Sequence, residues 1–149
     1  MTTSDNQNAE VAVRRTVESW AQAIRDKNVQ ALLKQYAPDF RSFDIAPPLQ
    51  TQGAEIRGKA MTQWFKNWSG TIDYEITQQV IVAGADAAYS SSLNHVAAKR
   101  ADDGSAVEWW MRATIGLRKS GGEWLITHEH TSVPFYMDGS YRAAIDLKP

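Results

Sequence analysis

The sequence contains no cysteine, which excludes disulfides, thiolate nucleophiles and cysteine-ligated zinc or iron–sulfur centres. It also lacks a hydrophobic run of membrane-spanning length, and its polar first residues contain neither the charged nor the apolar region of a secretory signal. With a net charge of -1 and no basic cluster, the chain offers no electrostatic surface for nucleic acid or an anionic membrane. We therefore expect a cytoplasmic protein that binds neither nucleic acid nor membranes.

Motifs for bound cofactors are also missing. The sequence has no glycine-rich phosphate loop and no flavin motif, and the Gly-x-Ser-x-Gly signature of a serine nucleophile does not occur. His128 and His130 share one face of a predicted strand, but only His95 is left to serve as a third metal ligand. The sequence therefore implies no cofactor and no metal centre.

The length of 149 residues fits one domain with a single hydrophobic core. We expect this domain to cover residues 1–149, with a disordered or loosely held start at about 1–8 and a C-terminal tail at about 135–149. Six tryptophans are many for this length. Because an indole buries a large area and keeps one polar donor, these residues favour a cavity or an interface.

The first part of the chain carries a helical pattern. Apolar residues recur at helical spacing between about residues 8 and 26, which predicts a long amphipathic helix. Asn28 is the expected N-cap of a second, shorter helix that includes Tyr36 and ends at Pro38.

A short strand and a third helix are predicted next. Alternation from Phe40 to Asp44 predicts the strand, and residues 49–58 are expected to form a loop over the mouth of a cavity. The third helix should begin after Gly58 and end near residues 69–70. Its face is strongly aromatic and is formed by Met61, Trp64, Phe65 and Trp68.

From residue 72 onwards the period changes to that of β-strands. Alternating apolar residues continue through four segments that are separated by turns at 84–86, 102–104 and 119–123. The first of these segments has an apolar face of Ile72, Tyr74, Ile76, Val80 and Val82. Such a meander, with the early short strand, forms one strongly bent sheet. The sequence thus predicts a cone-shaped α+β domain in which the helices close over the sheet.

The outer face of this sheet carries tryptophan. In the strand from 107 to 117 one face is apolar, yet Trp110 lies on the opposite face beside Arg112. The last strand repeats the pattern with Trp124 and Ile126 on the outer face. Since large apolar surfaces are normally covered, we expect a homodimer through the outer face of the sheet.

Three short segments and the order of the elements carry a family resemblance. The segments are Tyr36-Ala37-Pro38-Asp39, Gly122-Glu123-Trp124-Leu125-Ile126 and His128-Glu129-His130-Thr131-Ser132. The chain from about residue 10 to 135 resembles the SnoaL-like and ketosteroid-isomerase-like branch of the NTF2-like superfamily. This resemblance implies an NTF2-like cone of three N-terminal helices on a strongly curved, mostly antiparallel sheet. It does not specify a reaction, because the superfamily includes isomerases, cyclases, dehydratases, hydrolases and non-catalytic domains.

The resemblance implies a catalytic base at Asp44. In the isomerases the base is an aspartate in the first short strand, and Asp44 matches that place. The tyrosine that donates to the enolate oxygen in those enzymes falls on Trp20, and their protonated aspartic acid falls near Ala113. Since both donors are changed, the isomerase oxyanion hole is not reproduced and we do not expect ketosteroid isomerase activity.

The last strand supplies further candidates. The resemblance places Glu129 toward the interior, where a carboxylate needs a partner such as Arg112. A single bulge would reverse the inside–outside alternation of side chains in this strand and turn His128 and His130 inward instead. The two histidines then become candidates for metal binding or proton transfer, and His130 is included among the candidate catalytic residues, although a structural pair at a dimer interface is the favoured interpretation. Arg112 itself is interpreted either as an anion clamp or as half of a salt bridge.

These observations lead to one main hypothesis and two alternatives. The main one is a small-molecule enzyme or ligand-binding protein in which Asp44 accepts a proton from an apolar or oxygen-bearing substrate. Trp20, together with Glu129 or His130, is expected to stabilise the charge. The first alternative is a non-catalytic ligand-binding or oligomerisation module, and the second is a dehydratase or hydrolase that uses His128 or His130. The residues expected to contact the ligand are Trp20, Phe40, Met61, Trp64, Met111 and Arg112.

Overall fold

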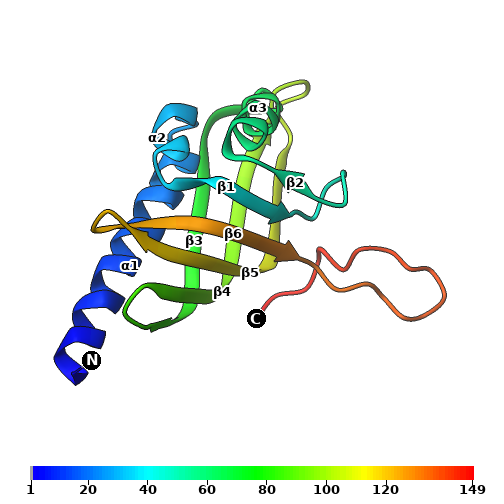
Figure 1. Cartoon of the computed structure of the whole chain (residues 1–149). Coiled ribbons are helices and arrows are strands. Elements are labelled where there is room, and N and C mark those ends of the chain that lie inside the picture. Colours follow the sequence, from blue (N-terminus) through cyan, green and yellow to red (C-terminus); the bar gives the residue numbers. More distant parts are fainter. Residues whose placement is uncertain (1) are drawn as a thin grey trace.

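Figure 1 shows the computed structural model of the protein, which describes residues 2–149. Three helices and six strands follow one another along the chain. The elements are α1 (Thr3–Arg25), α2 (Val29–Leu33), β1 (Tyr36–Phe43), β2 (Thr51–Gln52), α3 (Ala54–Phe65), β3 (Trp68–Ala83), β4 (Ala87–Arg100), β5 (Ala106–Ser120) and β6 (Glu123–Ser132).

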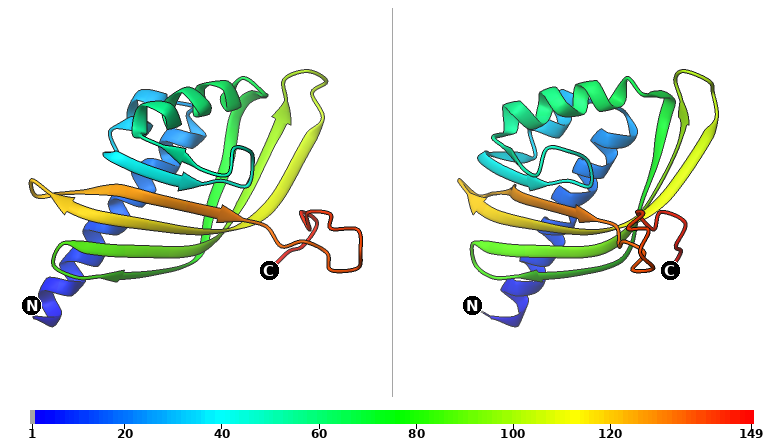
Figure 2. Two further views of the ribbon diagram at one scale, coloured as in Figure 1. Left: turned by 45° about the vertical axis from the view of Figure 1, so that its right-hand side comes forward. Right: turned by 90° about the vertical axis from the view of Figure 1, so that its right-hand side faces the viewer.

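All six strands belong to one sheet, in the order β2-β1-β6-β5-β4-β3. Neighbouring strands are antiparallel except β1 and β6, which run parallel. The long strands bend strongly along their length (Figure 2), and α1 packs against β3 and β6 while α3 packs against β1 and β2. The predicted α+β architecture of three helices on a curved, mostly antiparallel sheet is therefore confirmed.

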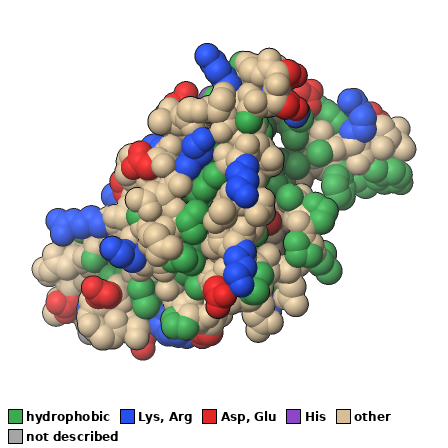
Figure 3. Space-filling model, turned by 90° about the horizontal axis from the view of Figure 1, so that it is seen from above, with side chains coloured by type: hydrophobic (Ala, Val, Ile, Leu, Met, Phe, Trp, Pro, Cys, Tyr) green, Lys and Arg blue, Asp and Glu red, His purple; other side chains and the backbone are tan. Residues whose placement is uncertain are grey.

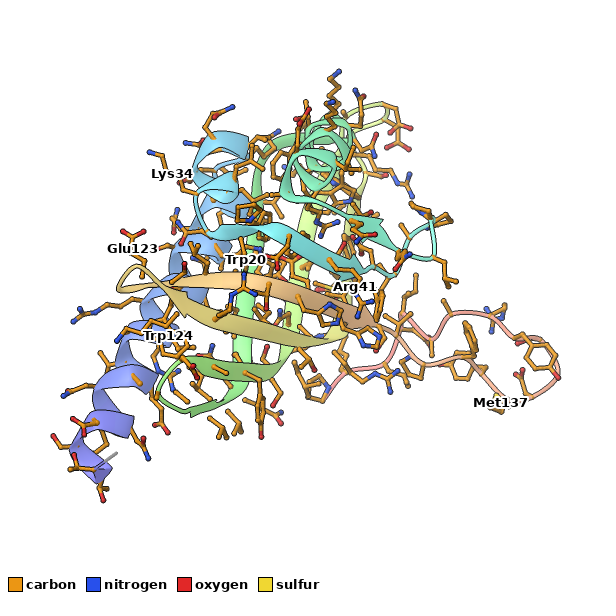
Figure 4. The ribbon with its side chains drawn as sticks, in the orientation of Figure 1. Trp20, Lys34, Arg41, Glu123, Trp124 and Met137 are labelled. Atoms are coloured by element: carbon orange, nitrogen blue, oxygen red, sulfur yellow. The ribbon has the colours of Figure 1, made fainter. Side chains whose placement is uncertain are left out.

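The core lies between α1 and the inner face of the sheet. Val13, Val17 and Trp20 of α1 are buried there, as their helical spacing predicts. Figure 4 shows Trp20 inside the fold, behind β1 and β6. No helix within residues 2–149 is long and apolar enough to cross a membrane.

The first helix begins earlier than predicted. It starts at Thr3, because Thr2 and Asp5 form a capping box in which each side chain binds the backbone N–H of the other. The predicted loosely held start at about residues 1–8 is thus mostly helical, and Met1 lies outside the described residues. Because the first turns of this helix are mostly polar, apolar periodicity does not predict them.

The second helix is shorter than predicted. It ends at Leu33, and β1 begins at Tyr36 and includes Pro38. Proline is tolerated here because β1 pairs with β2 only at Arg41 and Ser42, and its register with β6 shifts between Tyr36 and Arg41. The early strand is therefore longer than the Phe40–Asp44 segment expected, and Asp44 directly follows it.

The third helix also differs from the prediction. It spans Ala54–Phe65, so the expected loop at 49–58 holds β2 and the first turns of α3, and Gly58 lies inside the helix. A Cβ atom at Gly58 would lie 3.0 Å from Leu33 Cδ2, so glycine allows α2 and α3 to approach closely. Trp68, expected in this helix, instead opens β3.

A bulge in β3 exchanges its faces. Thr77 pairs with Leu93 and Val80 with Ser91, which leaves one extra residue in β3, and Gln78 has a positive φ of 50°. As a result Ile81 is buried, whereas Val80 and Val82 are exposed and do not continue the inner face as predicted.

A second bulge lies in β6. Leu117 pairs with Ile126 and Gly116 with His128, so Thr127 is the extra residue. Trp124 and Ile126 are buried on the inner face, which corrects the prediction that they lie outside. Because the bulge shifts the alternation, Glu129 and Thr131 also face inward.

The C-terminal arm, residues 133–149, protrudes from the end of β6 (Figure 1). A bridge between Phe135 and Ala143 and hydrogen bonds from the Tyr136 hydroxyl to Asp146 hold it together. Hydrophobic side chains gather on this arm (Figure 3), and Met137 lies at its outer end (Figure 4).

Candidate functional site

A cavity of about 440 Å³ lies between α3 and the inner face of the sheet. Its walls are mostly apolar, and Asp44 and Arg57 are the charged residues that border it. Such a combination of apolar walls and a few convergent polar groups is typical of small-molecule sites. The apolar wall includes Trp20 and Ile24 of α1, Met61 and Trp64 of α3, and Trp109 and Met111 of β5.

Arg57 is the centre of the polar end. Its Nη1 atom lies 2.5 Å from Oδ2 of Asp44, and its Nη2 atom lies 3.1 Å from Oε2 of Glu129. Arg57 stands in the first turns of α3, one turn before the buried Met61, so the helix directs it toward the sheet. One guanidinium therefore joins a carboxylate after β1 to a carboxylate on β6.

Glu129 is almost fully buried, at 2% exposure. Its Oε1 atom accepts a hydrogen bond of 2.7 Å from the Tyr36 hydroxyl, which in turn accepts one of 3.0 Å from Nε1 of Trp20. A continuous chain of hydrogen bonds thus runs from α1 through β1 to β6. Glu129 does not border the cavity, so it acts on the site by holding Arg57.

The Asp44 carboxylate accepts three hydrogen bonds besides facing the cavity. Arg57 donates to Oδ2, and the backbone N–H of Ile45 and the hydroxyl of Thr131 donate to Oδ1 at 2.7 Å and 3.2 Å. These contacts fix the orientation of the carboxylate at the end of β1.

The two carboxyl groups have opposite pKa shifts. Burial opposes ionisation of Asp44, but the Arg57 charge and the three hydrogen bonds outweigh it and hold the pKa of Asp44 below its usual value. For Glu129 burial is the larger effect and raises the pKa, although Arg57 and Tyr36 act against it. Burial also raises the pKa of Tyr36, and the neighbouring Glu129 raises it further. Asp44 is therefore ionised near neutral pH and faces the cavity beside the charged Arg57.

The structure brings together most of the residues that the sequence predicted for the site. Asp44, Trp20, Met61, Trp64 and Met111 all border the one cavity. Glu129 is directed inward as predicted, but its partner is Arg57 on α3.

Three predicted residues lie elsewhere, and two of them are Phe40 and Arg112. Phe40 is fully buried and stacks on Tyr36 with ring centroids 4.2 Å apart, so it belongs to the core. Arg112 is on the outer face, where Nε donates to the Ser132 hydroxyl, because it alternates with the inward Met111. It is therefore neither a clamp in this cavity nor the partner of Glu129.

The third is His130, which is exposed on the face of β6 opposite to Glu129, and its ring packs against Phe43. It borders a second, more open groove of about 870 Å³ that runs between the loop after β1 and the C-terminal arm. Asp44 reaches the edge of this groove as well. His128 lies on the same outer face and contacts the backbone oxygen of Arg41. The bulge in β6 therefore does not turn the histidines inward.

Sequence reasoning missed Arg57 and Tyr36. A helix boundary at Gly58 places Arg57 in a loop, whereas the spacing of Arg57, Met61 and Phe65, each four residues apart, could have revealed an arginine on the buried face. Helical spacing indicates only that Tyr36 occupies an apolar position, and it gives no information on the hydrogen bond that its hydroxyl donates to Glu129. No group of three or more His, Asp or Glu side chains within residues 2–149 is placed to hold a metal ion.

Comparison with known proteins identifies the family. The SnoaL-like domain matches residues 13–136. An NTF2-like protein of unknown function from Pseudomonas putida KT2440 is 34% identical, with a TM-score of 0.85, and the match covers 96% of this chain and 98% of that chain. No significant match to a curated protein is found.

Two more distant structures show the same fold. A ketosteroid isomerase-like protein from Erwinia carotovora atroseptica is 19% identical over 83% of this chain and 94% of that chain, with a TM-score of 0.72. An NTF2-like superfamily protein from Salmonella enterica serovar Typhimurium is 17% identical over 91% of this chain and 98% of that chain, with a TM-score of 0.77.

The fold and the match over residues 13–136 define a SnoaL-like domain protein. The chain belongs to the SnoaL-like family of the NTF2-like superfamily. The family relation predicted from the sequence is thereby confirmed.

Proposed function

We propose that this protein is an acid–base enzyme for a small, mostly apolar molecule, and that Asp44 accepts the proton. The observation that carries the proposal is that the Asp44 carboxylate and the Arg57 guanidinium border one largely apolar cavity. A base must be ionised before it acts, and the lowered pKa of Asp44 supports this condition.

Arg57 supplies the second part of the proposed chemistry. When a proton leaves a carbon next to a carbonyl group, negative charge develops on the oxygen. A fixed guanidinium beside the base stabilises such charge in a site that excludes most water. Glu129 and Tyr36 are positioning residues in this scheme, because they hold Arg57 and do not border the cavity.

The low basicity of Asp44 restricts the reaction. A carboxylate that is held by Arg57 removes protons slowly unless the substrate is already acidified by a neighbouring carbonyl group. The proposed reaction is therefore proton abstraction next to a carbonyl, as in an isomerisation or elimination, and it requires no cofactor.

Deuterium exchange tests the proposal with simple ketones in place of the natural substrate. Propiophenone and tetralone are incubated with the protein in deuterated buffer, and loss of the protons next to the carbonyl is followed by NMR. Wild-type protein should accelerate exchange, and Asp44→Asn should reduce the rate to that of buffer. Asp39→Asn is the matched control, since Asp39 is an exposed carboxylate paired with Arg118. Equal acceleration by wild type and Asp44→Asn would show that Asp44 is not the base.

A non-catalytic binding module is the second candidate function. The observation that favours it is that Asp44 already accepts three hydrogen bonds. A carboxylate with so many donors is as typical of a structural ion pair as of an active base. Absence of acceleration by wild-type protein, together with saturable binding of the same ketones, would favour this candidate.

We also propose that a homodimer forms through the outer face of the sheet. Trp110 remains half-buried on that face and packs against His95, with ring centroids 4.9 Å apart. Trp124, by contrast, lies in the core and no longer supports a dimer.

A further inference from the structure

The cavity wall contains hydrogen-bond donors that have no acceptor in the described part of the chain. The indole N–H of Trp109 and the Nε–H of Arg57 are buried and have no acceptor among residues 2–149, and both side chains border the cavity. A buried donor without a partner costs free energy, which an acceptor on a ligand would recover. At the polar end, by contrast, the Asp44 carboxylate is a satisfied acceptor, because it already accepts three hydrogen bonds.

Tyr74 is the third donor and the best supported one. Ser92 Oγ donates to Oδ1 of Asn94 at 2.7 Å, and Nδ2 of Asn94 donates to the Tyr74 hydroxyl at 2.8 Å. The hydroxyl oxygen thus serves as an acceptor, while its own proton has no acceptor among the described residues. Burial raises the pKa of Tyr74, so the proton stays on the oxygen. Hydrogen bonds in such a chain polarise one another and strengthen the terminal donor.

Strand register places two of these donors, Tyr74 and Trp109, in one row. Tyr74 pairs with Val96 across β3 and β4, and Val96 pairs with Trp109 across β4 and β5. All three residues border the cavity. Thr131, which donates to Asp44, pairs with Ala113, four residues along β5 from Trp109. At about 3.4 Å per residue the row lies about 14 Å along the strand from the Asp44 end.

We propose that the cavity takes a small neutral molecule whose carbonyl-type oxygen accepts a hydrogen bond from the Tyr74 hydroxyl, with Asn94 and Ser92 as positioning residues. The inference rests on the proposed use of this cavity for small molecules, but not on proton transfer by Asp44. A neutral ligand is favoured over a carboxylate because Asp44 and Glu129 share the single positive charge of Arg57. Trp109 is a second donor of the same row for an oxygen-rich ligand.

Binding of matched probes tests this proposal. Propiophenone carries the carbonyl oxygen, propylbenzene has the same shape without it, and phenylacetate replaces the ketone by a carboxylate. Wild-type protein should bind propiophenone more tightly than the other two, as measured by quenching of tryptophan fluorescence. Tyr74→Phe should weaken propiophenone by about tenfold, the value of one hydrogen bond, and change propylbenzene by less than about twofold. Asp44→Asn should retain the preference for the ketone, which separates this proposal from the catalytic one.

A second variant and a spectroscopic signal test the proposal even if Tyr74→Phe fails to fold. Ser92→Ala leaves the Tyr74 hydroxyl in place and should weaken propiophenone alone, by about two- to threefold. The carbonyl stretch of bound propiophenone should lie at lower frequency than in water-free solvent, and Tyr74→Phe should remove that shift. The proposal is overturned if wild type shows no preference for the ketone, if phenylacetate binds more tightly, or if Tyr74→Phe weakens both neutral probes equally.

Discussion

Arg57 on α3 and Glu129 on β6 are joined through Nη2 and Oε2 at 3.1 Å, and this pair connects the helical layer to the sheet. Both residues are buried, at 9% and 2% exposure. The same guanidinium also binds Asp44, so the geometry of the cavity wall depends on a carboxylate that does not border the cavity.

Removal of Glu129 should therefore destabilise the fold. Glu129→Leu leaves Arg57 and the Tyr36 hydroxyl with a lost partner, and we expect the free energy of unfolding to fall by about 3–5 kcal/mol. Glu129→Gln retains an acceptor for Tyr36 and should cost less, about 1–3 kcal/mol. Urea denaturation measures both. Glu108→Gln is the control, since Glu108 is an exposed carboxylate in a surface ion pair and its loss should change little. A Glu129→Leu variant as stable as wild type would refute the structural role.

The pH dependence of stability should report Asp44. A carboxyl group whose pKa is lower in the folded state stabilises the fold above the unfolded value of about 3.9, and this contribution is lost as the pH falls. We expect Asp44→Asn to lower the free energy of unfolding by about 1–3 kcal/mol at neutral pH. The difference from wild type should narrow below a pH of about 4.

Urea titrations near neutral pH and at about pH 3 measure this difference. Asp39→Asn removes an exposed carboxylate whose hydrogen bonds with Arg118 also lower its pKa, and added salt should abolish its effect. The effect of Asp44 should persist in salt, because its partner Arg57 is buried. A difference between wild type and Asp44→Asn that is constant from neutral to acid pH would contradict the lowered pKa.

The regular parts of this fold follow from the sequence, because periodicity is a strong local signal. The turns at 84–86, 102–104 and 119–123 separate the four long strands as predicted. The aromatic and apolar cavity residues Trp20, Met61 and Met111 likewise follow from helical or strand spacing.

The irregular parts do not follow from periodicity. Each bulge inserts one residue, so the alternation on either side of Gln78 or Thr127 is locally correct but refers to opposite faces. Arg57 was missed for a related reason, since Gly58 signals a helix boundary by propensity but serves here for close packing on Leu33. Both the bulges and the helical position of Gly58 depend on tertiary contacts, which local sequence patterns do not contain.

The dimer prediction can be tested at Trp110. Sedimentation velocity over a range of concentrations should show reversible dimerisation of the wild type. Trp110→Glu should shift the protein to monomer, because it replaces an apolar side chain of the proposed interface by a charge that the dimer would bury. Val11→Glu is the control, as Val11 is exposed on α1. A wild-type protein that stays monomeric at high concentration would contradict the prediction.

The bulge at Thr127 should be essential, because it alone lets two sets of residues share the inner face of β6. Deletion of Thr127 restores strict alternation, so either Trp124 and Ile126 or Glu129 must turn outward. Exposure of the two apolar side chains would cost about 3–6 kcal/mol, at about 1.5–3 kcal/mol each. Urea denaturation measures the loss, and tryptophan emission should shift to longer wavelength as Trp124 becomes solvated.

Thr127→Ala is the matched control for this deletion. It keeps the extra residue and removes only the hydrogen bond from Oγ1 to the backbone oxygen of Gly116, so the expected cost is about 0.5–1.5 kcal/mol. If the deletion variant were no less stable than Thr127→Ala, the inward placement of Glu129 would not depend on the bulge. The Arg57–Glu129 pair would then form without the extra residue, so contacts with α3 would be sufficient to keep Glu129 on the inner face of β6.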